Sequence, residues 1–111
     1  MGFKRNFEDS IGNIYLESYW YPASIVIDKK SNSGSISFHG FKDQTARDTG
    51  KNHITERNYF VTGDLFSEYL TALFSGKENA LSIAYRVALE SKDVMDNSGN
   101  LISFFEYAEQ I

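Results

Sequence analysis

Hydrophobic and polar residues alternate most strictly in residues 35–41, where Ile36 and Phe38 share one face of a strand and polar side chains share the other. A segment rich in β-branched residues, 23–29, precedes this one, and the turn-forming residues 28–34 separate the two. The pattern predicts a β-hairpin. We expect two more side chains on its buried face: Ile25 and Ile27.

Two further segments are predicted strands, residues 13–21 and 53–61. Pro22 follows the first and lacks an N–H group, so it marks a break or an edge position. The second has a mixed pattern, which suits a sheet edge or an interface. We expect residues 13–21 to carry Tyr15, Glu17, Tyr19 and Tyr21 on one face and Ile14, Leu16, Ser18 and Trp20 on the other.

The period of the apolar positions changes from two to that of a helix after Gly63. Asp64 is the expected N-cap, and Gly76 is the expected C′ residue. A second helix is predicted from about residue 78 to 91, with small residues that allow close approach to the first. The apolar face of the first helix should pack on the sheet and comprises Leu65, Phe66, Tyr69, Leu70, Leu73 and Phe74.

Both ends of the chain differ from the middle. Residues 1–12 are polar apart from two isolated rings, which predicts a flexible N-terminal arm that either frays or docks on a neighbour. Residues 101–107 are strongly apolar and are predicted as a last strand, which either returns to the sheet interior or presents its rings to a partner. The predicted fold is a single α+β domain over residues 13–111, with an antiparallel sheet of about five strands and two helices packed on one face.

Composition narrows the class of protein. The 111 residues carry 11 Lys and Arg against 15 Asp and Glu, so the formal charge of −4 argues against a dedicated duplex-DNA binder. The absence of cysteine excludes disulfides and thiolate metal sites. No signal-peptide pattern and no long apolar run occurs, so we expect folding in the cytoplasm and no membrane association. Aromatic residues make up 15% of the chain and serve either a small core or an interface.

Residues 42–52 form the longest predicted connection without apolar periodicity. Hairpin loops usually have two to five residues, so a longer loop is often functional or mobile. It is either a solvated loop whose charges satisfy one another or an arm that contacts the next subunit. Under the second interpretation, the interface residues are Lys42, Asp43, Arg47, Asp48 and Lys51, with Arg57 and Tyr59 on the following strand.

The sequence contains no clear catalytic pattern. His39 ends one predicted strand and His53 begins the next, so the two can be close across the loop. The spacing of His53 and Glu56 matches no zinc motif, and neither a nucleophile elbow nor a glycine-rich phosphate loop is present. We therefore expect solvated surface histidines, a non-enzymatic protein, and no metal or cofactor.

One region resembles a known class. Residues 46–51 (Ala-Arg-Asp-Thr-Gly-Lys) are followed by residues 59–63 (Tyr-Phe-Val-Thr-Gly) and an aromatic helix start at Leu65 and Phe66. This order, over roughly residues 36–89, resembles that of small structural proteins from the tail or neck of tailed bacteriophages and prophages. The resemblance implies a virion protein that assembles with copies of itself and with neighbouring virion proteins.

Two other classes fit the composition. A small acidic protein with exposed aromatic rings is also typical of an inhibitor or immunity-type protein that binds one enzyme. A single-stranded nucleic-acid binder would use Tyr and Trp as stacking platforms, although the negative charge makes nucleic acid an unfavourable partner.

Overall fold

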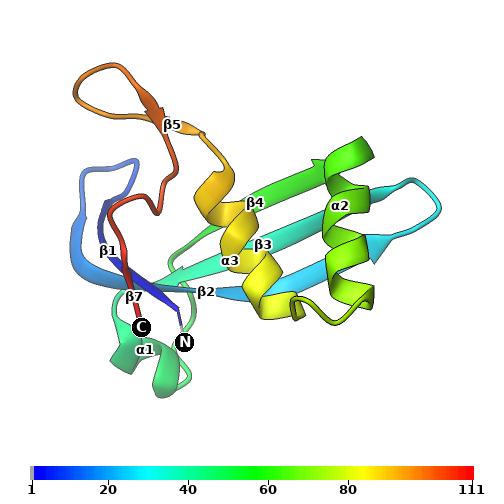
Figure 1. The fold of residues 1–111 in the computed structure, drawn as a ribbon. Coiled ribbons are helices and arrows are strands. Elements are labelled where there is room, and N and C mark those ends of the chain that lie inside the picture. Colours follow the sequence, from blue (N-terminus) through cyan, green and yellow to red (C-terminus); the bar gives the residue numbers. More distant parts are fainter. Residues whose placement is uncertain (1) are drawn as a thin grey trace.

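The computed structural model describes residues 2–111 and shows a twisted antiparallel sheet with helices on both faces (Figure 1). Five strands form the sheet in the order β4-β3-β2-β1-β7. The predicted α+β class with a five-stranded antiparallel sheet is confirmed. The sheet strands are β1 (Phe3–Glu8), β2 (Ile14–Asp28), β3 (Ser33–Phe41), β4 (Thr55–Thr62) and β7 (Glu109–Gln110).

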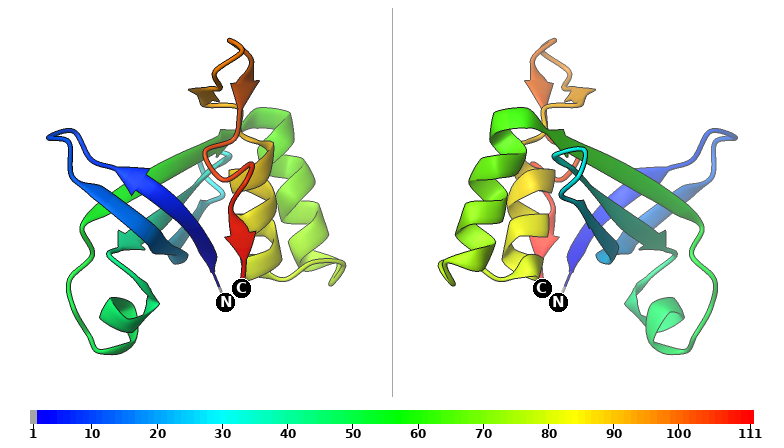
Figure 2. Two further views of the ribbon diagram at one scale, coloured as in Figure 1. Left: turned by 90° about the vertical axis from the view of Figure 1, so that its left-hand side faces the viewer. Right: turned by 90° about the vertical axis from the view of Figure 1, so that its right-hand side faces the viewer.

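Helices α2 (Gly63–Phe74) and α3 (Ala80–Glu90) lie side by side over one face of the sheet (Figures 1 and 2). The short helix α1 (Gln44–Asp48) lies on the opposite side (Figure 2). A small hairpin of β5 (Val94–Met95) and β6 (Leu101–Ile102) projects from these layers. Within residues 2–111, no helix is long and apolar enough to cross a membrane.

The predicted hairpin is the pair β2–β3, and its register places Ile25 opposite Ile36. Its turn is held by the side chain of Asp28, whose Oδ1 accepts hydrogen bonds from the backbone N–H groups of Lys30 and Ser31 at 3.0 and 3.3 Å. Because Ile36 then pairs with Tyr59 of β4, one face of three strands carries a continuous apolar row.

Strand β2 differs from the prediction in two ways. It continues through Pro22 as one 15-residue strand, with a register shift between Pro22 and Ser24 in place of a break. A second irregularity lies at Glu17, which has a φ of 58°, opposite the register shift between Arg5 and Phe7 of β1. A bulge of this kind disrupts strict alternation. The predicted faces hold after it, where Trp20 bonds Ser18 and Tyr19 stacks on Tyr21, but not before it, because Tyr15 lies with Trp20 against Phe7.

The expected flexible arm is wrong for residues 3–8, which form β1. Phe3 is only 1% exposed, and its ring stacks on Phe105 with 4.4 Å between centroids. The backbones of Gly2 and Ile111 exchange hydrogen bonds of 2.7 and 2.8 Å, so the two ends of the chain lie together (Figure 2). Phe3 provides the buried apolar surface that ties this segment to the sheet.

The predicted strand over residues 101–107 is also wrong beyond Ile102. Only Leu101 and Ile102 pair, in the β5–β6 hairpin, and the chain then turns inward. Phe104 and Phe105 enter the core, 8% and 0% exposed, whereas Tyr107 is 83% exposed. Phe104 and Phe105 thus follow the first of the two alternatives, a return to the interior, but irregular backbone carries them there.

The helices match their predicted positions. Thr62, rather than Asp64, is the N-cap of α2, and Asp64 lies in its first turn. Gly76 has a φ of 79° directly after the C-cap, as a C′ glycine should. Asn79 caps α3 in a reciprocal capping box with Ser82. The side chains buried between sheet and helices include Trp20, Ile36, Phe38, Tyr59, Val61, Phe66, Tyr69, Ala84, Tyr85, Val87, Ala88 and Phe105.

Candidate functional site

The outer half of β2 is a free sheet edge. Strand β1 reaches only as far as Trp20 on β2, so within residues 2–111 residues 24–28 pair with β3 alone. Their backbone groups on the other side have no strand beside them. A row of unpaired N–H and C=O groups is a template for adding another strand.

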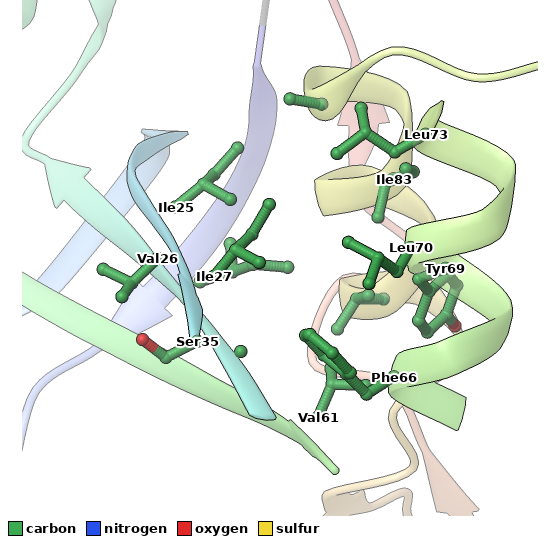
Figure 3. A pocket seen from close by; sticks show the side chains of 14 residues that line it. Ile25, Val26, Ile27, Ser35, Val61, Phe66, Tyr69, Leu70, Leu73 and Ile83 are labelled. Carbon is green, nitrogen blue, oxygen red and sulfur yellow. The ribbon is translucent and has the colours of Figure 1, made fainter. Parts of the chain in front are cut away.

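An apolar recess, here called the β2 cleft, lies beside this edge between the β2–β3 hairpin and the two helices (Figure 3). Ile25 and Ile27 point toward the helices, whereas Val26 points away (Figure 3). The opposite wall is apolar as well. The main side chains around the cleft are Ile27, Ile36, Phe66, Leu70, Leu73 and Ile83.

Ile25 and Ile27 share the face of Ile36, as predicted, but they are not buried. They remain 37% and 43% exposed, because no strand covers their outer side. Apolar side chains that stay exposed beside an unpaired strand edge are typical of an interaction surface and not of a hydrophobic core.

The β2 cleft is small enough to bind individual side chains and too small for a drug-sized ligand. Its volume is about 50 Å³, whereas sites for drug-sized ligands usually have roughly 300–1,000 Å³. One or two apolar side chains of an added strand fit such a recess. The arrangement matches strand addition, in which main-chain hydrogen bonds bind the segment and alternate side chains enter pockets.

The sheet also ends at β4, as its mixed pattern predicted, and at the two-residue strand β7. Glu56 and Arg57 lie within β4, and charged residues on an edge oppose pairing with other strands. Residues 24–27 of β2 carry no charge. The β2 edge is therefore a better acceptor than β4.

The predicted charged loop contains helix α1, which the sequence did not indicate. Oδ1 of Asp43 accepts a hydrogen bond of 2.7 Å from the N–H of Ala46 and caps this helix. The guanidinium of Arg47 lies 4.7 Å from the ring centre of Tyr21 and 3.4 Å from Asp48. These three candidate interface residues thus have partners within the chain, and Lys42 and Lys51 beside them are exposed.

The other two candidate interface residues lie on the helix-covered face of β4. Arg57 forms a 2.7 Å ion pair with Asp93 and stacks 4.0 Å from the ring centre of Phe104. Tyr59 is 5% exposed, and burial raises its pKa to about 12. The structure does not bring the seven candidates together. Including Tyr59 in an interface was wrong, because the core of its own chain covers it.

The two histidines do meet. The rings of His39 and His53 stack with 3.9 Å between centroids. Nε2 of His39 lies 3.6 Å from Oε2 of Glu56, and Nε2 of His53 lies 3.9 Å from the same oxygen. Partial burial and the neighbouring His53 lower the pKa of His39, against the opposing effect of Glu56. The prediction that the two histidines can be close across the loop is confirmed, and of the expected solvated pair His53 is exposed whereas His39 is half-buried.

The sequence held one signal for the β2 cleft. A predicted strand of seven residues, 23–29, follows an N-terminal segment with only three apolar residues in its first ten, Met1, Phe3 and Phe7. If the first strand is short and pairs with a longer second strand, the end of the second strand has no partner on that side. Leu70 and Leu73 carried no such signal, since a helix stripe is the same whether it faces a core or a cleft.

Comparison with known proteins gives no assignment: no family model, no curated protein and no solved structure matches this chain.

Proposed function

We propose that this protein is a non-enzymatic structural or adaptor protein of a phage virion, in the tail or neck, that assembles by accepting an extended segment of a neighbouring subunit at the β2 cleft. The neighbour is another copy of the chain or an adjacent virion protein. The observation that carries the proposal is the free edge of residues 24–28 beside an apolar recess.

The chemistry of this surface favours a protein partner. The cleft offers apolar side chains and unpaired backbone groups, which an extended peptide satisfies together. A net charge of −4 opposes a phosphate backbone. The residues that a stacking platform would need are partly in the core, with Trp20 at 0% and Tyr19 at 2% exposure.

The virion context rests on the resemblance in residues 36–89. Its order of elements, a strand, the Ala-Arg-Asp-x-Gly segment, a second strand and a helix beginning at a glycine, is the order β3, α1, β4 and α2. Helix α1 lies on the side of the sheet opposite α2 and α3 (Figure 2); Arg47 is in this helix, and Lys42 and Lys51 flank it in the chain. A subunit with contact surfaces on two opposite sides is suited to a ring or a stack.

The experiment is sedimentation velocity of the purified chain, alone and mixed with the virion proteins encoded beside it. Ile27→Lys puts a charge at the cleft, whereas Val26→Lys puts the same charge on the preceding residue, which borders the cleft but whose side chain points away from the helices (Figure 3). Both positions are exposed, at 43% and 53%, so neither change should unfold the monomer.

We expect the wild type and Val26→Lys to form larger species and Ile27→Lys to remain monomeric. Equal sedimentation of all three in every mixture would contradict assembly at the cleft. A wild-type chain that stays small and binds one unrelated enzyme one-to-one would instead support the inhibitor class.

A further inference from the structure

We infer that His39, His53 and Glu56 form a binding site for a divalent transition-metal ion of the zinc class. Within residues 2–111, they are the group of three potential ligands whose ligand atoms all lie within 4.8 Å of one another. The sites and contacts proposed above do not use them.

The fold positions all three ligands from the backbone. His39 and Glu56 are direct partners in the register of β3 and β4, so their side chains lie next to each other on the same face of the sheet. His53 lies three residues before Glu56, and the hydrogen bond of 2.8 Å from the N–H of Ile54 to the carbonyl of Gly40 holds it against the end of β3. Little backbone movement is therefore needed to bring the ligands together.

The geometry converges on one point. Both imidazoles direct Nε2 toward Oε2 of Glu56, at 3.6 and 3.9 Å. In a tetrahedral zinc site with bonds of about 2.1 Å, ligand atoms are separated by about 3.4 Å. All three ligand atoms lie within 4.8 Å of one another, so side-chain rotations that bring them to this separation place an ion between them.

Two imidazoles and one carboxylate are a ligand set that zinc uses with a fourth, open position. The side chains of His53 and Glu56 are 40% and 50% exposed, so an ion can enter from solvent and water or a neighbouring molecule can complete the shell. Nitrogen ligands favour Zn²⁺, Cu²⁺ and Ni²⁺ over Mg²⁺ and Ca²⁺, which prefer oxygen alone. The loop between β3 and β4 contains α1, and a bound ion would tether the end of this loop at His53 to His39 on β3.

The test is calorimetric titration of ZnCl₂ into the metal-free, untagged protein, with MgCl₂ as the comparison. We expect saturable binding of one zinc ion per protein chain and no comparable binding of magnesium. The melting temperature should be higher with zinc. Co²⁺ should give the visible absorption of a four-coordinate ion.

Glu56→Gln and His53→Gln should each weaken zinc binding at least about tenfold, since loss of even a second-shell partner has this effect. Glu8→Gln, which alters an exposed carboxylate on β1, should bind like the wild type. Far-UV circular dichroism confirms that the variants are folded, and Glu56→Gln keeps the side chain nearly isosteric.

A zinc-linked dimer that disappears in Glu56→Gln would also support the site, because a second copy would then fill the open position. Absence of saturable binding to folded wild-type protein would overturn the inference. So would wild-type affinity in both the Glu56→Gln and His53→Gln variants.

Discussion

Gly40 is a position where the core leaves no room for a single additional methyl group. A Cβ atom there would lie 2.8 Å from Cε2 and Cζ2 of Trp20 and 2.9 Å from its Cδ2. Carbon atoms pack best at about 3.5–4.0 Å, so Gly40→Ala leaves the methyl group roughly 0.7 Å too close to the ring.

The indole ring of Trp20 cannot move away from the added methyl group, because other side chains surround it. Trp20 is fully buried, its Nε1–H donates a 2.9 Å hydrogen bond to Oγ of Ser18, and its ring lies edge-to-face against Phe104 at 5.1 Å and Phe105 at 5.7 Å. Overpacking of a well-filled core typically costs about 1–3 kcal/mol. We therefore expect Gly40→Ala to reduce the free energy of unfolding by about 2 kcal/mol.

Urea unfolding followed by far-UV circular dichroism measures this loss. With a slope of about 2 kcal/mol/M, a change of 2 kcal/mol lowers the unfolding midpoint by about 1 M and leaves the slope unchanged.

The control is the same change in a Trp20→Phe background, where the smaller ring leaves space for the methyl group. Trp20→Phe is itself destabilising, so the informative quantity is the coupling between the two changes, expected at about 0.5–3 kcal/mol. An unchanged midpoint in Gly40→Ala, or an equal cost in both backgrounds, would refute the packing described here.

Three further predictions follow from individual contacts. Phe66→Ala should lower stability by about 3–5 kcal/mol, because the ring is only 5% exposed; an unchanged thermal melt would place the α2 face wrongly. Arg47→Ala should weaken assembly but lower the free energy of unfolding of the monomer by at most about 1 kcal/mol, because an exposed cation–π contact such as that with Tyr21 contributes no more. A large drop in the monomer's melting temperature would contradict this. Burial and the 2.7 Å hydrogen bond to Glu90 raise the pKa of Tyr69 to about 12, above the roughly 10 of an unfolded tyrosine. This stabilisation is present below about pH 10 and is lost as the pH rises toward 12, so denaturation curves of Tyr69→Phe should show a shallower loss over that window.

Regular periodicity predicted the regular parts of the fold. The helical stripes of α2 and α3 and the alternation in β3 placed Phe38 and Phe66 in the core, where they are 0% and 5% exposed. Gly76 ended its helix for the same local reason. These features depend on residues that are close in the sequence.

Irregular features escaped prediction because they depend on distant partners. Glu17 has a positive φ opposite the register shift between Arg5 and Phe7, and no local sequence pattern indicates either feature. In the sequence Phe3 is an isolated ring, because its stacking partner Phe105 lies about a hundred residues later. The pairing of His39 with Glu56 follows from the β3–β4 register, which depends on the loop between them and cannot be determined from spacing alone.

Amide hydrogen exchange of the free and the assembled chain is the most direct measurement of strand addition at β2. We predict that the amides of residues 24–28 gain protection on assembly, while those of β4, an end strand of the sheet, exchange as they do in the free chain. Unchanged exchange in residues 24–28, with new protection at β4 or around α1 instead, would contradict assembly through the β2 cleft.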